Sequence, residues 1–189
     1  MEYLGLSARL LIGALFLVAG ASKLRDLSQF RAEVANYQVL PAALVTPTAR
    51  ALPALEVAVG AMLLLGVLIV PVAVVAAVVL VAFAGGIWIN VQRERRIGCG
   101  CGFRRRQEVS NRLVLRNAGY TAAAVVAAVW PSAALALAPG PGVPASTLTV
   151  ADALGVAVAT ATAAAIVVVG LDARRFLAQQ RASAAVYAR

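Results

Sequence analysis

Apolar stretches of about 20 residues follow one another along almost the whole chain. A helix needs about 20 apolar residues to cross the hydrocarbon core of a bilayer, and in that core the backbone must satisfy its hydrogen bonds internally. We therefore predict an all-α integral membrane protein, with a bundle of four transmembrane helices and a fifth, C-terminal transmembrane helix. The predicted spans are residues 4–24, 53–70, 72–91, 113–138 and 150–171.

Prolines set several of the predicted boundaries. Proline is well placed in the first turn of a helix, so we expect the second span to begin near Pro53. Pro71 is predicted to end the second span and separate it from the third. Pro131 is predicted to lie inside the fourth span.

The composition supports a chain that lipid covers. Hydrophobic residues make up 62% of the sequence, whereas a soluble domain is usually about 45–50% apolar. The formal net charge is +9, but the arginines flank the apolar spans, where they would bind anionic lipid headgroups. We therefore predict membrane lipid as a partner and no nucleic acid.

The spans and their connections divide the chain into three parts. Residues 1–138 are predicted to form the four-helix membrane domain, residues 139–149 an extracytoplasmic loop, and residues 150–189 the fifth helix with a basic cytoplasmic tail. Between the first two spans, three apolar residues at helical spacing predict a short surface helix: Phe30, Val34 and Tyr37.

Basic residues predict the orientation in the membrane. With five spans, the connections after the first and third spans share one face with the C-terminus, and they carry most of the arginines. Short cytoplasmic loops carry the excess of Lys and Arg in membrane proteins. We therefore expect a multi-pass protein of the plasma membrane with its N-terminus outside and its C-terminus in the cytoplasm.

Five polar residues are predicted to lie at similar depth near the basic face, because the spans that carry them begin or end there. Charges inside membrane spans usually face the bundle interior and pair with one another. Glu56 is therefore expected to pair with Lys23 or Arg116. One interpretation is an ion-paired clamp between helix ends, and the other is a polar pocket that serves the thiols. The five residues are Lys23, Glu56, Asn90, Arg116 and Asn117.

Cys99 and Cys101, the only cysteines of the chain, are the strongest candidates for catalysis. Glycines at positions 98, 100 and 102 let the backbone turn tightly, and arginines on both sides favour the reactive thiolate. Two soft ligands so close together could instead bind copper or zinc, although a structural zinc site has about four ligands and the chain has no histidine. A third interpretation is a loop whose cysteines have no special role.

Four stretches of the sequence resemble the MauE family of methylamine utilisation proteins, within the wider DoxX-like group. They are LLIGALFLVAGASKLRDLSQFRAEVANYQVLP, ALPALEVAVGAMLLLG, IGCGCGF and LRNAGY, and the resemblance covers roughly residues 8 to 130. The family usually has Cys-x-Cys-Phe-Gly, whereas here Gly102 precedes Phe103. The positions that match the family pattern are Gly20, Lys23, Pro41, Pro53, Glu56, Cys99, Cys101, Arg116 and Asn117.

This resemblance implies a bacterial membrane protein built on four helices. It also implies a thiol-redox accessory protein that helps another protein mature, working with a thioredoxin-like or other thiol-bearing partner through Cys99 and Cys101. The residues identify no cofactor, although a membrane quinone is one acceptor that a relay with a single cysteine pair could use. Two alternatives are a non-catalytic subunit of a larger, respiratory membrane complex and a protein that handles soft metals.

Overall fold

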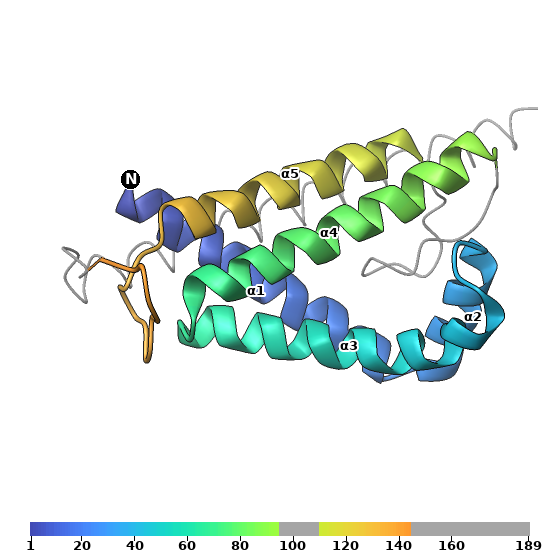
Figure 1. Cartoon of the computed structure of the whole chain (residues 1–189), viewed down its shortest axis with the longest axis horizontal. Helices are drawn as coiled ribbons and strands as arrows, with labels where there is room; N and C mark the ends of the chain where they lie inside the picture. Colours follow the sequence, from blue (N-terminus) through green and yellow to red (C-terminus); the bar gives the residue numbers. More distant parts are fainter. Residues whose placement is uncertain (95–109, 145–189) are drawn as a thin grey trace, which may run out of the picture.

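The computed structural model describes residues 1–94 and 110–144, and this part of the chain is all-α, as predicted (Figure 1). The predicted fifth span and the two cysteines lie outside the described residues. The helices are α1 (Glu2–Leu24), α2 (Leu27–Tyr37), α3 (Ala42–Leu65), α4 (Ile69–Gln92) and α5 (Asn111–Val129).

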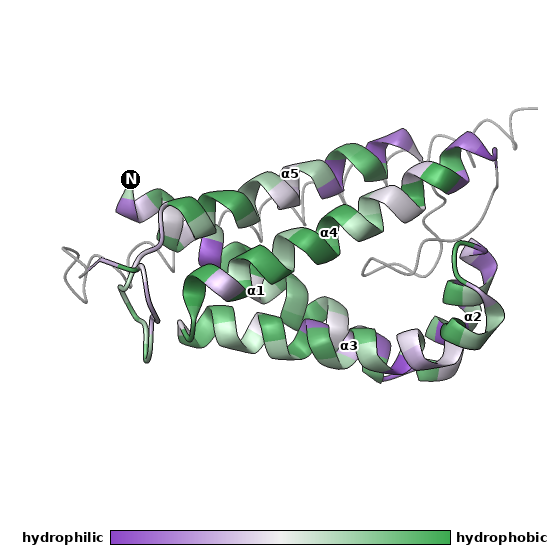
Figure 2. Ribbon diagram, viewed as in Figure 1, coloured by the Kyte–Doolittle hydropathy of each residue, from purple (hydrophilic) through white to green (hydrophobic). Residues whose placement is uncertain are grey.

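The four long helices alternate in direction, and α1 packs along α3 while α4 packs along α5 (Figure 1). Three of them, α1, α3 and α4, are long and apolar enough to cross a bilayer. The first two turns of α5 contain Arg112, Arg116 and Asn117, which makes that helix more polar. Figure 2 shows the apolar surface along the helices and the hydrophilic residues at the end near α2. These features define a helical membrane protein.

Three glycines let α1 and α3 approach closely. A Cβ at Gly20 of α1 would lie 2.8 Å from the backbone nitrogen of Val57 in α3, and a Cβ at Gly60 of α3 would lie 2.8 Å from the carbonyl oxygen of Gly13 in α1. Small residues at such positions are typical of membrane helices, which associate through close packing because lipid is as apolar as their own side chains. This glycine contact fixes which residues of α1 face which residues of α3.

The predicted start of the second span is wrong. The helix begins at Ala42, after Pro41, and continues through Pro53. Proline is tolerated inside membrane helices more readily than in soluble ones, and α1 packs closely here, since a Cβ at Gly20 would lie 2.8 Å from the Pro53 carbonyl oxygen. As a result Glu56 lies near the middle of α3, and not one turn from its start.

The predicted break at Pro71 is also wrong by a few residues. The chain turns at Gly66 and Leu68, which both adopt the left-handed conformation with φ of 65° and 48°. Glycine is the residue that most readily ends a helix in this conformation. Pro71 then falls in the first turn of α4, where a missing N–H does no harm.

The fourth span is shorter than predicted, because α5 ends at Val129. Pro131 does not continue the helix, since it has no N–H to donate and disfavours helical geometry in the residue before it. The chain that follows lies against the turn between α3 and α4. There the Leu68 nitrogen donates to the Ala138 oxygen at 2.9 Å, and the Leu137 nitrogen donates to the Leu65 oxygen at 3.0 Å.

Arg9 holds this segment against α1. Its guanidinium is fully buried and donates from Nη1 to the Ser132 oxygen and from Nη2 to the Ala134 oxygen, both at 2.8 Å. The two carbonyls belong to irregular backbone that would otherwise lack partners inside the membrane. Arg9 is therefore a structural anchor at the end of the bundle opposite α2.

The short helix predicted between the first two spans is confirmed as α2. Asp26 caps its start by accepting a hydrogen bond from the Gln29 nitrogen at 3.0 Å, a common arrangement at helix N-termini. Phe30 is the buried residue of this helix, and it turns toward the end of α1.

Candidate functional site

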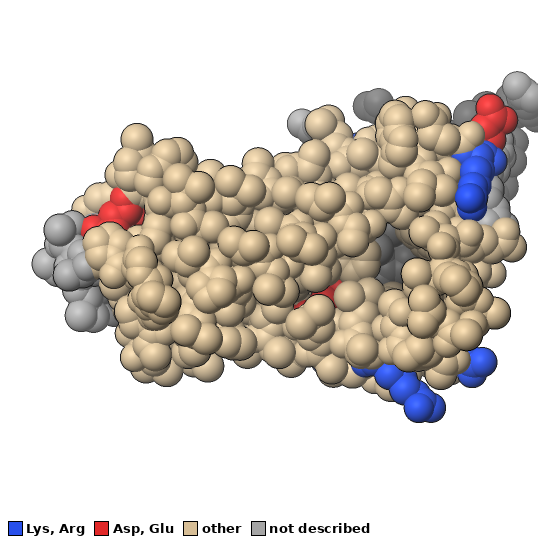
Figure 3. All heavy atoms as spheres, viewed as in Figure 1, with Lys and Arg blue, Asp and Glu red and all other residues tan. Residues whose placement is uncertain are grey.

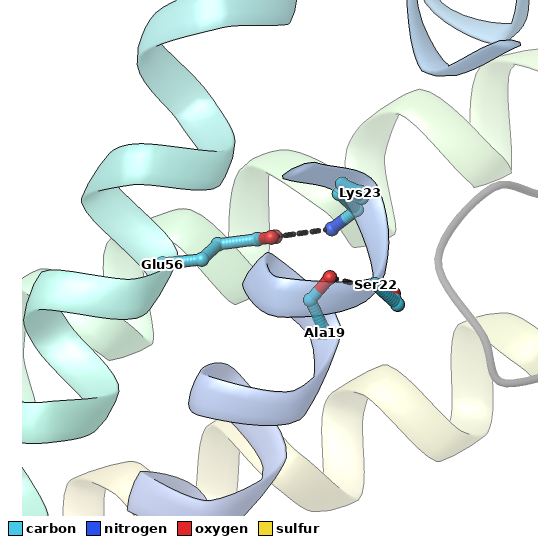
Figure 4. A network of polar contacts seen from close by, with 4 residues as sticks. All are labelled: Ala19, Ser22, Lys23 and Glu56. Atoms are coloured by element: carbon cyan, nitrogen blue, oxygen red, sulfur yellow. Dashed lines mark hydrogen bonds and ion pairs between the residues drawn. The ribbon is translucent and has the colours of Figure 1, made fainter. Parts of the chain in front are cut away.

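A buried ion pair joins α1 to α3. Lys23, in the last turn of α1, donates from Nζ to both carboxylate oxygens of Glu56, with a distance of 2.6 Å to Oε2 (Figure 4). The residues are 5% and 1% exposed, respectively. The sequence offered two possible partners for Glu56, Lys23 and Arg116. In the structure the partner is Lys23. The pair is possible because Gly20 and Gly60 bring the two helix backbones together.

Aromatic rings from two other helices complete the surroundings of the Lys23 ammonium. Nζ lies 5.3 Å from the ring centroid of Phe30 in α2 and 5.0 Å from that of Phe83 in α4. A cation near an aromatic face gains electrostatic attraction, which is stronger when water is excluded. The ammonium is therefore stabilised by one carboxylate and two rings, contributed by three different helices.

A cavity of about 30 Å³ lies beside this pair. Its walls are largely apolar and come from α1, α3, α4 and α5, with the polar groups concentrated at Lys23, Glu56 and Asn117. A volume of this size holds about two water molecules. The lining residues are Leu15, Phe16, Ala19, Lys23, Glu56, Leu80, Phe83, Asn117 and Tyr120.

The five predicted pocket residues therefore divide into two groups. Lys23, Glu56 and Asn117 line one cavity, whereas Asn90 and Arg116 do not. Asn90 is fully buried, and its Nδ2 donates to the Tyr37 oxygen at 3.1 Å and to the Gly86 oxygen at 3.0 Å. Asn90 thus fastens α4 to the end of α2, and Arg116 is half-buried on α5.

Cys99 and Cys101 fall in the connection between α4 and α5, outside the described residues. The last described residues before this connection are attached to α2, because Arg93 donates from Nη1 to the Gln38 oxygen at 3.2 Å. Among residues 1–94 and 110–144, no cluster of three His, Cys, Asp or Glu side chains could hold a metal ion.

Sequence reasoning missed the aromatic part of the site. It placed Phe30 on a short helix but did not predict that its ring would face Lys23, and it did not single out Phe83. The only signal in the sequence was a buried lysine expected at a helix end, since such a charge requires partners around it. Phe30 and Phe83 are distant in sequence from Lys23, so their contacts follow from the packing of α2 and α4.

On the face shown in Figure 3, basic side chains gather at the end that carries α2. Acidic atoms are visible at both ends and in a hollow in the middle of the same face. The asymmetry of the basic side chains is the basis of the predicted orientation, and which end faces the cytoplasm stays a prediction.

Together the fold and the site define a membrane protein of apolar helices with a buried lysine–glutamate pair and, beside it, a small cavity whose largely apolar walls include a few polar side chains. Residues 1–131 match the family described as methylamine utilisation protein MauE, and the chain belongs to this family.

Relatives agree with this assignment. The chain is 43% identical over 130 residues to methylamine utilization protein MauE of Paracoccus denitrificans, which covers 67% of this chain and 69% of the relative. It is 41% identical over 95 residues to MauE of Methylophilus methylotrophus, covering 50% of each, and 38% identical over 129 residues to MauE of Paracoccus versutus, covering 66% and 69%. No solved structure shows significant similarity to the chain.

Proposed function

We propose that this chain is an accessory membrane protein of methylamine utilisation that exchanges disulfides with a partner protein through Cys99 and Cys101. The observation that carries the proposal is the placement of both cysteines of the chain, separated by one glycine, inside the stretch that matches the MauE family. The family name supports the metabolic role, and the cysteine pair supports the chemistry.

Disulfide exchange needs no cofactor within this chain. One Cys thiolate attacks a disulfide of the partner, forms a mixed disulfide and releases a partner thiolate. The second Cys thiolate then attacks the mixed disulfide, so that a Cys99–Cys101 disulfide forms and the partner leaves with two thiols. The reverse sequence oxidises the partner. A disulfide between alternate residues requires a bent backbone, and strain makes such a bond easier to reduce, which suits transfer in either direction.

The described residues on both sides of this connection belong to packed helices. Asn90 and Arg93 bond the end of α4 to the end of α2, and Asn111 starts α5 on the other side of the connection. A partner that engages the cysteines would therefore meet a segment whose described flanks belong to the packed helices.

The proposal is tested by replacing the cysteines in a Paracoccus denitrificans strain that lacks its own MauE. Cys99→Ser and Cys101→Ser should each abolish growth on methylamine, and the double variant should be no worse, because residues that act as a unit are not additive. Each single variant should also accumulate a mixed disulfide that is visible after acid quenching on a non-reducing gel, with the double variant as control. Full growth with either single variant, at normal expression, would contradict the redox role and favour a non-catalytic subunit.

The orientation is tested separately. An impermeant maleimide should fail to label Cys99 and Cys101 in intact spheroplasts and should label them after lysis in reductant, because the basic connection is expected in the cytoplasm. Variants with one exposed cysteine, Arg25→Cys and Leu137→Cys, provide reference positions at the two ends of the described helices. Labelling of Cys99 in intact spheroplasts would place the thiols on the outer side, where disulfides form more readily.

A further inference from the structure

The amide of Asn117 is a buried polar group at the cavity whose bonding the described helices leave incomplete. Asn117 is 6% exposed, and its Nδ2 has no hydrogen-bond partner among the described residues. Leaving such a group unpaired in a protein interior is destabilising, and lipid offers no hydrogen bond to it. Asn117 lines the same cavity as the Lys23–Glu56 pair.

We propose that this cavity is a hydration site, in which bound water bridges the Asn117 amide and the Glu56 carboxylate. The cavity wall offers water both a hydrogen-bond donor and a hydrogen-bond acceptor. The Asn117 amide nitrogen donates hydrogen bonds and needs an acceptor, whereas the Glu56 carboxylate accepts hydrogen bonds and takes a donor. Water supplies both functions in one molecule, and the cavity volume of about 30 Å³ exceeds the 10–15 Å³ or so that one water requires.

The site has a consequence for Glu56. Lys23 already donates to both carboxylate oxygens, and each oxygen has a second lone pair that a water can use. Water at this position stabilises the ionised carboxylate from the α5 side while the ammonium stabilises it from the α1 side. It also gives Glu56 a neighbour with which it can exchange protons inside an apolar bundle. This role is independent of the cysteines and goes beyond disulfide exchange.

Magic-angle-spinning NMR on the protein in lipid bilayers tests the proposal directly. With ¹⁵N-labelled asparagine, magnetisation that starts on water should reach the Asn117 side-chain amide. Two other asparagines are internal controls. Asn111 is exposed and should receive transfer from bulk water, whereas Asn90 is buried and bonded to two backbone oxygens and should receive little. The Asn117 signal is assigned by its loss in Asn117→Leu. Transfer to Asn111 but not to Asn117 would overturn the proposal.

Filling the cavity gives a second, independent test. Ala19 lines the cavity, and Ala19→Ile adds apolar atoms to it. If water bridges Asn117 and Glu56, Ala19→Ile displaces it and lowers the unfolding midpoint, but has no such effect in an Asn117→Leu background, where no amide needs the water. If the cavity is dry, Ala19→Ile raises the midpoint in both backgrounds, and the proposal fails. The NMR measurement uses the unmodified protein, so it decides the matter even if a filled variant does not fold.

Discussion

Removing the two partners of the buried ion pair should have unequal effects on stability. Breaking a buried pair by deleting one partner typically costs about 3–5 kcal/mol, because the other charge is left in a site of low polarity. Lys23→Met removes both hydrogen bonds from Nζ to Glu56 and leaves the carboxylate without its cation, so we expect a loss in that range.

Glu56→Gln should be milder. The Lys23 ammonium keeps the faces of Phe30 and Phe83, at 5.3 and 5.0 Å, and each such contact contributes about 0.5–2 kcal/mol. The glutamine oxygen also still accepts one hydrogen bond from Nζ. The two ring contacts together total about 1–4 kcal/mol, so we expect Glu56→Gln to lose less stability than Lys23→Met by roughly that amount. The double variant should be more stable than Lys23→Met alone, with a coupling of about 1–3 kcal/mol.

Reversible unfolding in mixed micelles, followed by circular dichroism, measures these free energies. Arg25→Met and Glu94→Gln are matched controls, since both residues are exposed and their changes should stay within about 0.5 kcal/mol. A larger loss for Glu56→Gln than for Lys23→Met would refute the role given to the aromatic rings. Additive effects in the double variant would show that the pair does not hold α1 to α3.

Two further predictions concern the helix contacts that position the site. Gly60→Ala should lower stability by about 1–3 kcal/mol, because the added methyl meets the α1 backbone. Gly85→Ala is the control, since a Cβ there meets nothing within 4 Å, and it should not lower stability. Equal melting temperatures of the two variants in detergent would contradict the close contact. Arg9→Lys should speed hydrogen exchange at the backbone amides of residues 134–138, since a lysine cannot hold both carbonyls in the geometry of a guanidinium; unchanged exchange there would mean that Arg9 does not anchor the segment.

Much of the helical pattern could be predicted from the sequence. The length of the apolar stretches predicted α1 and α4 to within a few residues. The spacing of Phe30, Val34 and Tyr37 predicted α2. Charge reasoning inside the spans also led to Glu56 and Lys23, because an isolated glutamate in an apolar helix demands a nearby cation.

The errors all concern features that depend on packing. Proline alone does not decide where a membrane helix starts or stops, since α3 continues through Pro53 while α5 stops before Pro131. The difference lies in the neighbours: Gly20 of α1 fits against Pro53, whereas the chain after Val129 leaves the helix axis and bonds to Arg9. Neither contact is visible in a local stretch of sequence.

The position of the ion pair explains why so small a polar site would matter to the whole bundle. Lys23 belongs to α1, its carboxylate partner to α3, its aromatic neighbours to α2 and α4, and Asn117 of α5 lines the cavity beside it. In lipid, apolar contacts between helices are easily exchanged for contacts with acyl chains, so close packing and polar contacts carry most of the specificity. The glycines provide the close packing between α1 and α3, and the Lys23–Glu56 salt bridge lies at the point where this helix pair meets α4 and α5. Loss of the pair and its proposed water would leave the two helix pairs joined mainly by contacts that lipid can replace.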